Sequence, residues 1–350
     1  MQKKPLNAES SGGVGVVERV AMVFQAIGRW VFLAVFLAFL GAGQGRAQSA
    51  GPEQVFVGAY INDIQQLDLK THSYAVDMYV WFRWKNPDFN PMASVEFMNS
   101  FARSSHVLTP LFDKPEDLPG GWKYTAFRNQ GQFTTKLPLQ RYPFDQQHLN
   151  IEFEDSTTTS DKLVFVPDKL PVVLNPDIGL PGYIIGDAKL TIKDRPYTTV
   201  FGDTRDLIPL PYSRVTISVP VHRPTFTNAV KVFVPLLLII ACAALIFFIH
   251  PGYVEGRIGM GITSLLTLVA LQLTTNSSLP DVDYLLMIDQ LYFAAYLFII
   301  CTLAQIVRGS WLAHRDEVEV AARLDGQAFR WLLLGYIGIS GLIVWNALDS

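Results

Sequence analysis

The stretch EGRIGMGITSLLTLVALQLTTNSSLP, residues 255–280, is long and apolar enough to form a helix that crosses a membrane. Alternate steps of four and three residues from Gly259 put hydroxyl, small and bulky side chains on one helix face: Thr263, Leu266, Ala270, Leu273 and Ser277. Unpaired polar groups are costly in hydrocarbon, so contact with lipid does not explain this face. Several such helices around an axis would present it to water. Burial in a helix bundle, with the hydroxyls bonded to neighbouring helices, is the equally weighted alternative.

The composition of the chain is that of a membrane protein. Half of its residues are apolar and its mean hydropathy is +0.24, which a purely soluble protein would rarely show. A net charge of −3 with dispersed bases gives no sign of nucleic-acid binding. We predict a four-helix transmembrane domain over residues 223–350. Its expected spans are 228–249, 258–279, 284–307 and 329–348.

The N-terminal region has the pattern of a signal peptide. A short apolar run, Trp30 to Leu40, follows Arg29 and precedes a small-x-small cleavage pattern at residues 45–47. We therefore predict that residues 1–47 are a signal peptide with its n-region. Because that n-region is unusually long, Met22 is an alternative start. An uncleaved membrane anchor is the competing interpretation.

Cleavage after residue 47 would leave residues 48–222 outside the cell membrane, as an extracellular or periplasmic domain. The charges of the loops between the predicted spans support this orientation. The loops placed inside the cell carry arginine, whereas the short outer loop at residues 281–283 carries no basic residue. These arginines are Arg257, Arg308, Arg315, Arg323 and Arg330. The two cysteines, Cys242 and Cys301, lie in predicted spans. The exported domain therefore has no disulfide and must be held together by its own core.

Residues 55–220 have the pattern of a β-sandwich. Short β-rich runs alternate with turn residues, and in the run from residue 74 to residue 84 apolar and polar side chains alternate with a period of two. About ten strands in a segment of this length favour one sandwich of two sheets, of the immunoglobulin-like kind. The fold class expected for the chain is thus an all-β sandwich followed by a four-helix transmembrane bundle.

Signals of catalysis are weak. The six histidines show no metal-ligand spacing, and the chain contains no Gly-x-Ser-x-Gly, phosphate-binding glycine loop or candidate nucleophilic cysteine. Carboxylates cluster at residues 152–155, but a charged strand end is usually a solvated edge. We expect no enzyme activity, no cofactor and no metal site.

Four local motifs follow one another in an order and at spacings that resemble a known family. They are Tyr142-Pro-Phe-Asp145 with the segment after it, Pro235 twelve residues after Arg223, Gly261 to Leu268 with Leu279-Pro280, and Tyr284 to Tyr296. Over roughly residues 52–350 the chain is similar to the prokaryotic pentameric ligand-gated ion channels. These belong to the superfamily of Cys-loop receptors, but here the cysteines that bracket the Tyr-Pro-Phe-Asp loop in animal members are absent.

The resemblance implies a homopentamer in the lipid bilayer, with the second span lining a ligand-gated pore. The predicted pore-lining and gate residues are Glu255, Gly259, Thr263, Leu266, Ala270, Leu273 and Ser277. Glu255 falls where cation channels of this family carry an acidic residue, and a ring of carboxylates concentrates cations. This position predicts selectivity for monovalent cations. The competing interpretation is that Glu255 only pairs with Arg257 at the start of the helix.

The resemblance also implies an agonist site between subunits of the outer domain, walled by aromatic residues. The candidate residues are Glu154, Phe201 and Tyr212, which would offer an amine a carboxylate and aromatic faces. Ser156 and Leu108 stand where the family has aromatic residues. The sequence therefore does not decide whether the agonist is an amine, a proton or another small molecule. The pore helix has no histidine, unlike the acid-gated member of the family.

For coupling between the two domains the resemblance implies a contact of Asp145 with Arg223 at the membrane surface. It places Asp68 of the first hairpin beside this pair and Pro280 below it. A strut that only holds the domains together is the alternative to a role in gating. For the whole chain, the alternative function is a membrane-anchored β-sandwich sensor or adaptor without ion conduction.

Overall fold

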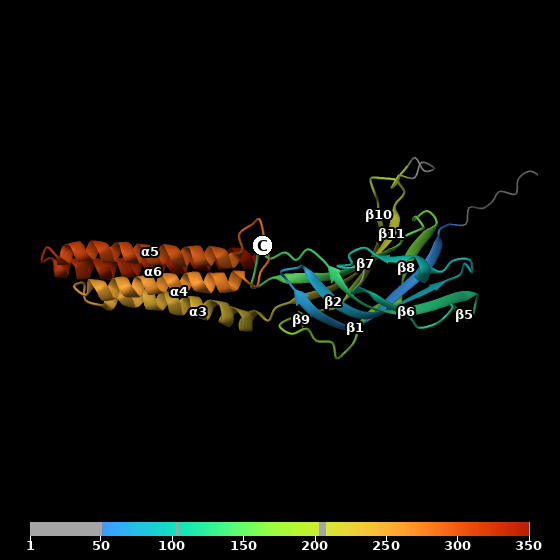
Figure 1. Cartoon of the computed structure of the whole chain (residues 1–350), viewed down its shortest axis with the longest axis horizontal. Helices are drawn as coiled ribbons and strands as arrows, with labels where there is room; N and C mark the ends of the chain where they lie inside the picture. The colour runs from blue at the N-terminus through green and yellow to red at the C-terminus, as the bar shows by residue number, and fades with distance from the viewer. Residues whose placement is uncertain (1–50, 103–104, 203–207, 350) are drawn as a thin grey trace, which may run out of the picture. The chain divides into compact units, whose positions relative to one another are not determined.

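The computed structural model describes residues 51–102, 105–202 and 208–349. The predicted signal peptide and the alternative start at Met22 lie outside these residues. The described chain consists of an N-terminal β-sandwich followed by four long helices (Figure 1). This is the fold class that the sequence predicts.

The strands form two sheets, one of six strands and one of five. The first has the order β4-β6-β2-β1-β8, with β5 paired to β6; the second has the order β10-β11-β7-β3, with β9 paired to β11. The only parallel pairing among the described strands joins β1 and β8. The strands of the first sheet are β1 (Glu53–Asp68), β2 (Ser73–Trp84), β4 (Val107–Pro110), β5 (Glu116–Leu118), β6 (Trp122–Thr134) and β8 (Leu163–Leu174). Those of the second are β3 (Val95–Phe97), β7 (Gln146–Asp155), β9 (Ile184–Ile185), β10 (Lys189–Arg195) and β11 (Tyr212–His222).

Aromatic side chains join the two sheets at the core. Phe153 of β7 lies 6.3 Å from Phe82 of β2 and 6.0 Å from Phe165 of β8, measured between ring centroids. The alternation in β2 is confirmed, since its apolar positions are buried and the residues between them are half-buried. One short helix, α2 (Pro91–Ser94), lies within the sandwich and begins at Asn90, whose side chain accepts from the Met92 amide.

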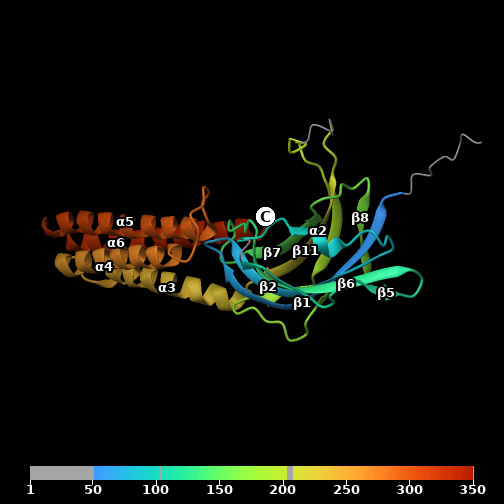
Figure 2. The same ribbon diagram turned by 45° about the vertical axis from the view of Figure 1, so that its right-hand side comes forward.

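Four helices are long and apolar enough to cross a membrane. They are α3 (Thr225–Leu245, continued by the 3-10 turn η2, Ile246–Phe248), α4 (Val254–Asn276), α5 (Met287–Ala313) and α6 (Val318–Asp349). They lie alongside one another in both views of the chain (Figures 1 and 2). Helix α6 begins well before its apolar run at residue 329, because the charged segment in front of that run continues the helix.

Candidate functional site

The residues predicted to line a pore lie on one exposed side of α4. In the single chain all seven are exposed: Glu255, Gly259, Thr263, Leu266, Ala270, Leu273 and Ser277. The exposed fraction is 63% for Leu266 and 65% for Leu273. The opposite side of α4 is buried against the other helices through Arg257, Gly261, Ser264 and Leu268. Helix α4 thus has one packed face and one face that meets no other part of the described chain.

The hydroxyl groups of α4 divide between these two faces. Three threonines on the exposed side donate to the carbonyl oxygen four residues earlier, each at 2.8 Å: Thr263, Thr267 and Thr274. On the packed side, Thr275 shares a hydrogen bond of 2.8 Å with the Tyr292 hydroxyl, and Tyr296 donates to Gln272 at 2.7 Å. Bonding to neighbouring helices, the bundle interpretation of the sequence, therefore describes the packed side and not the exposed one.

Glu255 is not paired with Arg257. The Arg257 side chain is fully buried, and its Nη2 lies 2.6 Å from Asp325 Oδ2 of α6. Gln305 of α5 donates to the other oxygen of Asp325 at 3.1 Å. Within the described chain the Glu255 carboxylate is exposed and makes no ion pair. The competing interpretation of Glu255 as the partner of Arg257 was wrong, because α6 supplies the partner.

The β-sandwich and the four helices belong to one compact unit, Gly51–Ser350, and two of the predicted coupling residues meet within it. Arg223 Nε lies 3.4 Å from Asp145 Oδ1; the Asp145 side chain is almost fully buried and Arg223 is half-buried. Gln147 donates to the second oxygen of Asp145 at 2.7 Å. The contact predicted between Asp145 and Arg223 is therefore present as an ion pair of imperfect hydrogen-bond geometry, since neither facing atom has a hydrogen-bond partner.

Two tyrosines complete the surroundings of Arg223. Its Nη2 donates to the Tyr183 hydroxyl at 2.6 Å, and its guanidinium lies over the rings of Tyr183 and Tyr142, 4.6 and 5.3 Å from their centroids. Burial raises the pKa of Tyr183 to about 12, so its phenol stays neutral at physiological pH and accepts from the guanidinium. The sequence motifs did not point to Tyr183.

The other two predicted coupling residues do not join this ion pair. The Asp68 carboxylate accepts from the Lys70 backbone amide at 2.8 Å, and this bond lowers the pKa of Asp68. It makes no ion pair or hydrogen bond with Arg223 in the described chain, so the placement of Asp68 beside the pair stays a prediction. Pro280 follows the buried Leu279 in the connection between α4 and α5, and makes no polar contact with Asp145.

The candidate agonist residues gather around a tyrosine that the sequence analysis missed. Tyr197 lies in edge-to-face contact with Phe201 and with Tyr212, at centroid distances of 5.3 and 5.6 Å. Its hydroxyl donates to Glu154 Oε2 at 2.9 Å. Burial and this bond to Glu154 raise the pKa of Tyr197. A third aromatic residue only four positions before Phe201 was the signal that could have found it.

The carboxylate of Glu154 is already paired with an arginine of the same chain. Arg214 of β11 donates from Nε to Glu154 Oε1 at 2.5 Å and from Nη1 to Glu152 Oε2 at 2.8 Å. Because Glu154 is buried and paired with a guanidinium, it does not offer a free charge to an amine. The aromatic faces of Phe201 and Tyr212 remain accessible in part, since Phe201 is exposed and Tyr212 half-buried.

The described ranges contain no group of three or more His, Cys, Asp or Glu side chains arranged to hold a metal ion. The two cysteines are free thiols in α3 and α5.

Comparison with known proteins finds relatives that are named as a chloride channel or as receptor subunits. The pH-sensitive chloride channel 2 of Anopheles gambiae is 23% identical over 262 residues, which are 67% of this chain and 42% of that protein. The gamma-aminobutyric acid receptor subunit beta-4 of Gallus gallus is 22% identical over 274 residues, 73% of this chain and 54% of that protein. A gamma-aminobutyric acid receptor subunit beta-like of Drosophila melanogaster is 27% identical over 179 residues, 50% of this chain and 34% of that protein. No family model matches the chain.

The chain thus spans about half the length of the curated relatives that it matches, or less. With its N-terminal β-sandwich and four spanning helices, it is a multi-pass protein of the cell membrane with the sandwich on the outer side. Its fold and these relatives support a resemblance to the superfamily of pentameric ligand-gated ion channels. These relatives are animal proteins, and the prokaryotic origin that the sequence suggests stays a prediction.

Proposed function

We propose that this chain is the subunit of a ligand-gated ion channel, in which five copies place the exposed face of α4 around a water-filled axis. The observation that carries the proposal is this face, which has small, hydroxyl and leucine side chains and no partner within the described chain. A helix surrounded by lipid would be expected to present apolar side chains all round. Self-assembly would place the same face of every copy against a common axis.

The direct test is ion flux into liposomes that contain only the purified protein, together with the mass of the assembly. The proposal predicts a pentamer and a flux of monovalent ions that an outer-domain ligand or pH alters. Well-folded protein that carries no ions under any such condition would support the anchored sensor or adaptor instead. Intact-mass measurement of the same preparation would test cleavage after residue 47, and with it the first residue of the predicted domain 48–222.

We further propose selectivity for cations, supported by the exposed, unpaired Glu255 at the first turn of α4. Five carboxylates close to the axis would attract cations and repel anions. Two facts support the opposite selectivity: the N-terminus of a helix favours anions, and the Anopheles relative is named a chloride channel. We favour cation selectivity, because the full charge of Glu255 would outweigh the partial charge of the helix end.

The replacement Glu255→Gln is therefore expected to lower the preference for cations while the protein still assembles. The side chain keeps its size and loses its charge. Reversal potentials in a salt gradient measure the change. Glu319→Gln, an exposed change in the first turn of α6, is the matched control and should leave selectivity as it is. If the Glu255→Gln channel keeps the original reversal potential, the selectivity filter must lie at other residues.

The leucines of the exposed α4 face are proposed to form the gate. Leu266 from five copies would make a dry constriction that opposes a hydrated ion. Leu266→Ser should therefore raise the flux in the absence of agonist, measured in liposomes at equal protein content. Leu334→Ser on the exposed side of α6 is the control. Equal resting flux in the Leu266 variant and the original protein would contradict the assignment.

For the agonist, we propose the aromatic cluster of Tyr197, Phe201 and Tyr212 as the contact surface of a small cation. The carboxylate Glu154 would hold it only if Arg214 moved away. Attraction to aromatic rings does not need that movement, so cation–π contact is the better-supported device. The name of the Anopheles relative supports the proton as the second candidate agonist.

A further inference from the structure

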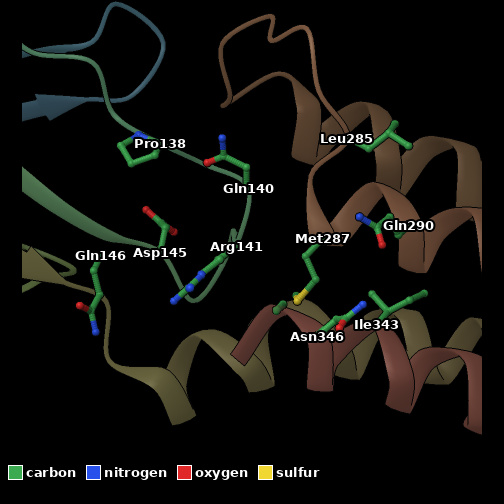
Figure 3. Close-up of a pocket in the computed structure, with 11 residues that line it drawn as sticks. Pro138, Gln140, Arg141, Asp145, Gln146, Leu285, Met287, Gln290, Ile343 and Asn346 are labelled. Atoms are coloured by element: carbon green, nitrogen blue, oxygen red, sulfur yellow. The ribbon is translucent and has the colours of Figure 1, made fainter. Parts of the chain in front are cut away.

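Gln147 joins the two arms of the loop that meets the helices. This loop runs from Pro138 to Asp145, and Figure 3 shows these two residues on its opposite arms, with Gln140 farther along toward the helices. Gln147 is the second residue of β7, and its side chain is fully buried. Its amide nitrogen donates to the Pro138 carbonyl and to Asp145 Oδ2, both at 2.7 Å. One side chain thus bonds both ends of the loop.

The orientation of the Gln147 amide is set by these two partners. A backbone carbonyl and an ionised carboxylate can only accept hydrogen bonds, so the NH2 group of the amide must face both of them. The amide oxygen then faces away, and it is buried without a hydrogen-bond partner in the described chain. A buried polar atom without a partner destabilises a fold. The two donor bonds therefore have to offset this cost, and they are what the residue contributes.

The other hydrogen bonds inside the loop are local. The Tyr142 amide donates to the Leu139 carbonyl at 2.9 Å, and the Phe144 amide donates to the Arg141 carbonyl at 2.7 Å. Both are turns between residues three positions apart, so neither joins one arm to the other. The sequence of the outer domain contains no cysteine, and a disulfide cannot close the loop. Among the described residues, Gln147 alone joins the two arms by hydrogen bonds.

The segment between the arms makes the contacts of this loop with the helices. The Gln140 carbonyl accepts from the Met287 amide at the start of α5, at 3.0 Å. The Phe144 ring stacks on the Phe233 ring of α3, with centroids 6.1 Å apart. A hydrogen bond tolerates little displacement of its two atoms, so the first contact depends on where the tip of the loop lies. The tip in turn depends on how the two arms are held.

We propose that Gln147 is a positioning residue that keeps the 138–145 loop closed and holds its tip against α3 and α5. The same amide orients Asp145, because a bond to Oδ2 leaves Oδ1 facing Arg223 Nε at 3.4 Å. Without this amide the arms would separate more often and the contacts at the tip would open, while β7 and β11 would stay paired. The role concerns the junction of the two domains and does not depend on whether the helices conduct ions.

Hydrogen–deuterium exchange of the full-length protein in detergent, measured by mass spectrometry of its peptides, tests the proposal. Gln147→Leu keeps the approximate size of the side chain and removes both donor bonds. We expect peptides covering residues 139–144 and 284–288 to exchange about ten-fold faster, the scale of one or two lost hydrogen bonds, and peptides of β2 to exchange as before. Because no ion flux is measured, failure of this proposal is separate from failure of the channel proposal.

Asn62→Leu is the matched control. The Asn62 amide also donates to a carboxylate, that of Asp77, at 2.8 Å, but it joins β1 to β2 and not the arms of the loop. This variant should leave exchange in residues 139–144 and 284–288 unchanged. Equal acceleration of these peptides by both variants would show that any lost amide–carboxylate bond loosens the loop, and would overturn the assignment to Gln147.

The remaining outcomes also decide the matter. Acceleration by Gln147→Leu that is equal in β2 and in the loop would show a general contribution to stability and would contradict a positioning role, as would unchanged exchange in the loop. If Gln147→Leu does not fold, Gln147→Asn is the second variant, because it keeps the amide on a side chain one methylene shorter. It cannot reach both acceptors, so the same peptides should exchange faster by a smaller factor. Original exchange rates in Gln147→Asn would overturn the proposal.

Discussion

Asp325→Leu is expected to lower the stability of the helical domain by about 3–5 kcal/mol, the usual cost of leaving a buried charge unpaired. Arg257 is fully buried, and two of its nitrogens, Nε and Nη1, already have no hydrogen-bond partner. Removal of Asp325 would leave the guanidinium without its counter-charge inside the bundle. Thermal unfolding of the purified protein, followed by the loss of its assembled form, measures the effect.

The double variant Arg257→Leu/Asp325→Leu should recover much of this loss, because two apolar side chains need no counter-charge. Glu319→Gln is the control, since its pairing with Arg323 is long, at 3.9 Å, and exposed, and such pairs contribute little. A single Asp325→Leu variant that unfolds at the original temperature would show that water or another group reaches Arg257. Equal loss in the single and double variants would assign the effect to packing.

Arg223→Gln is expected to be more damaging than Asp145→Asn, although both remove the same ion pair. Without Arg223, the buried Asp145 carboxylate keeps only the bond from Gln147. Without the charge of Asp145, Arg223 still donates to Tyr183 and lies over two aromatic rings. The cost of a broken buried pair, about 3–5 kcal/mol, should therefore fall mainly on the arginine variant.

The double variant separates a strut from a gating contact. If the pair acts in gating, the two changes should shift the response of assembled channels non-additively in a double-mutant cycle. Loss of assembly without a shifted response would support a strut. Asp117→Asn, which removes an exposed carboxylate of β5 that pairs with Lys123 of β6, is the matched control. Purely additive shifts would contradict an energetic link between Asp145 and Arg223.

Much of the fold was predictable because it depends on patterns of apolar and polar residues that repeat over short distances in the sequence. The alternation of β2 and the apolar runs of the four helices each act over a few neighbouring residues. The exposed α4 face followed from the helical period alone. The start of α6 was harder, because its first turns are charged and only the apolar part of the helix gives a span signal.

The partners of buried charges were not predictable in the same way. Asp325 lies 68 positions from Arg257 and precedes the apolar run of its helix, so only the packing of α6 reveals the pair. Glu154 is occupied by Arg214 because β7 and β11 are neighbours in the second sheet. A sequence shows each charged residue but not the strand register or helix contact that neutralises it.

The exposed face of α4 has a consequence for mixtures of subunits. If copies share one water path, a side chain altered in a single copy changes the path for all of them. A cell that makes original and altered chains together would then contain mostly mixed rings, and their behaviour would not be the average of the two pure forms. Changes on this face should be dominant, whereas changes on the outer surface of α6 should be recessive.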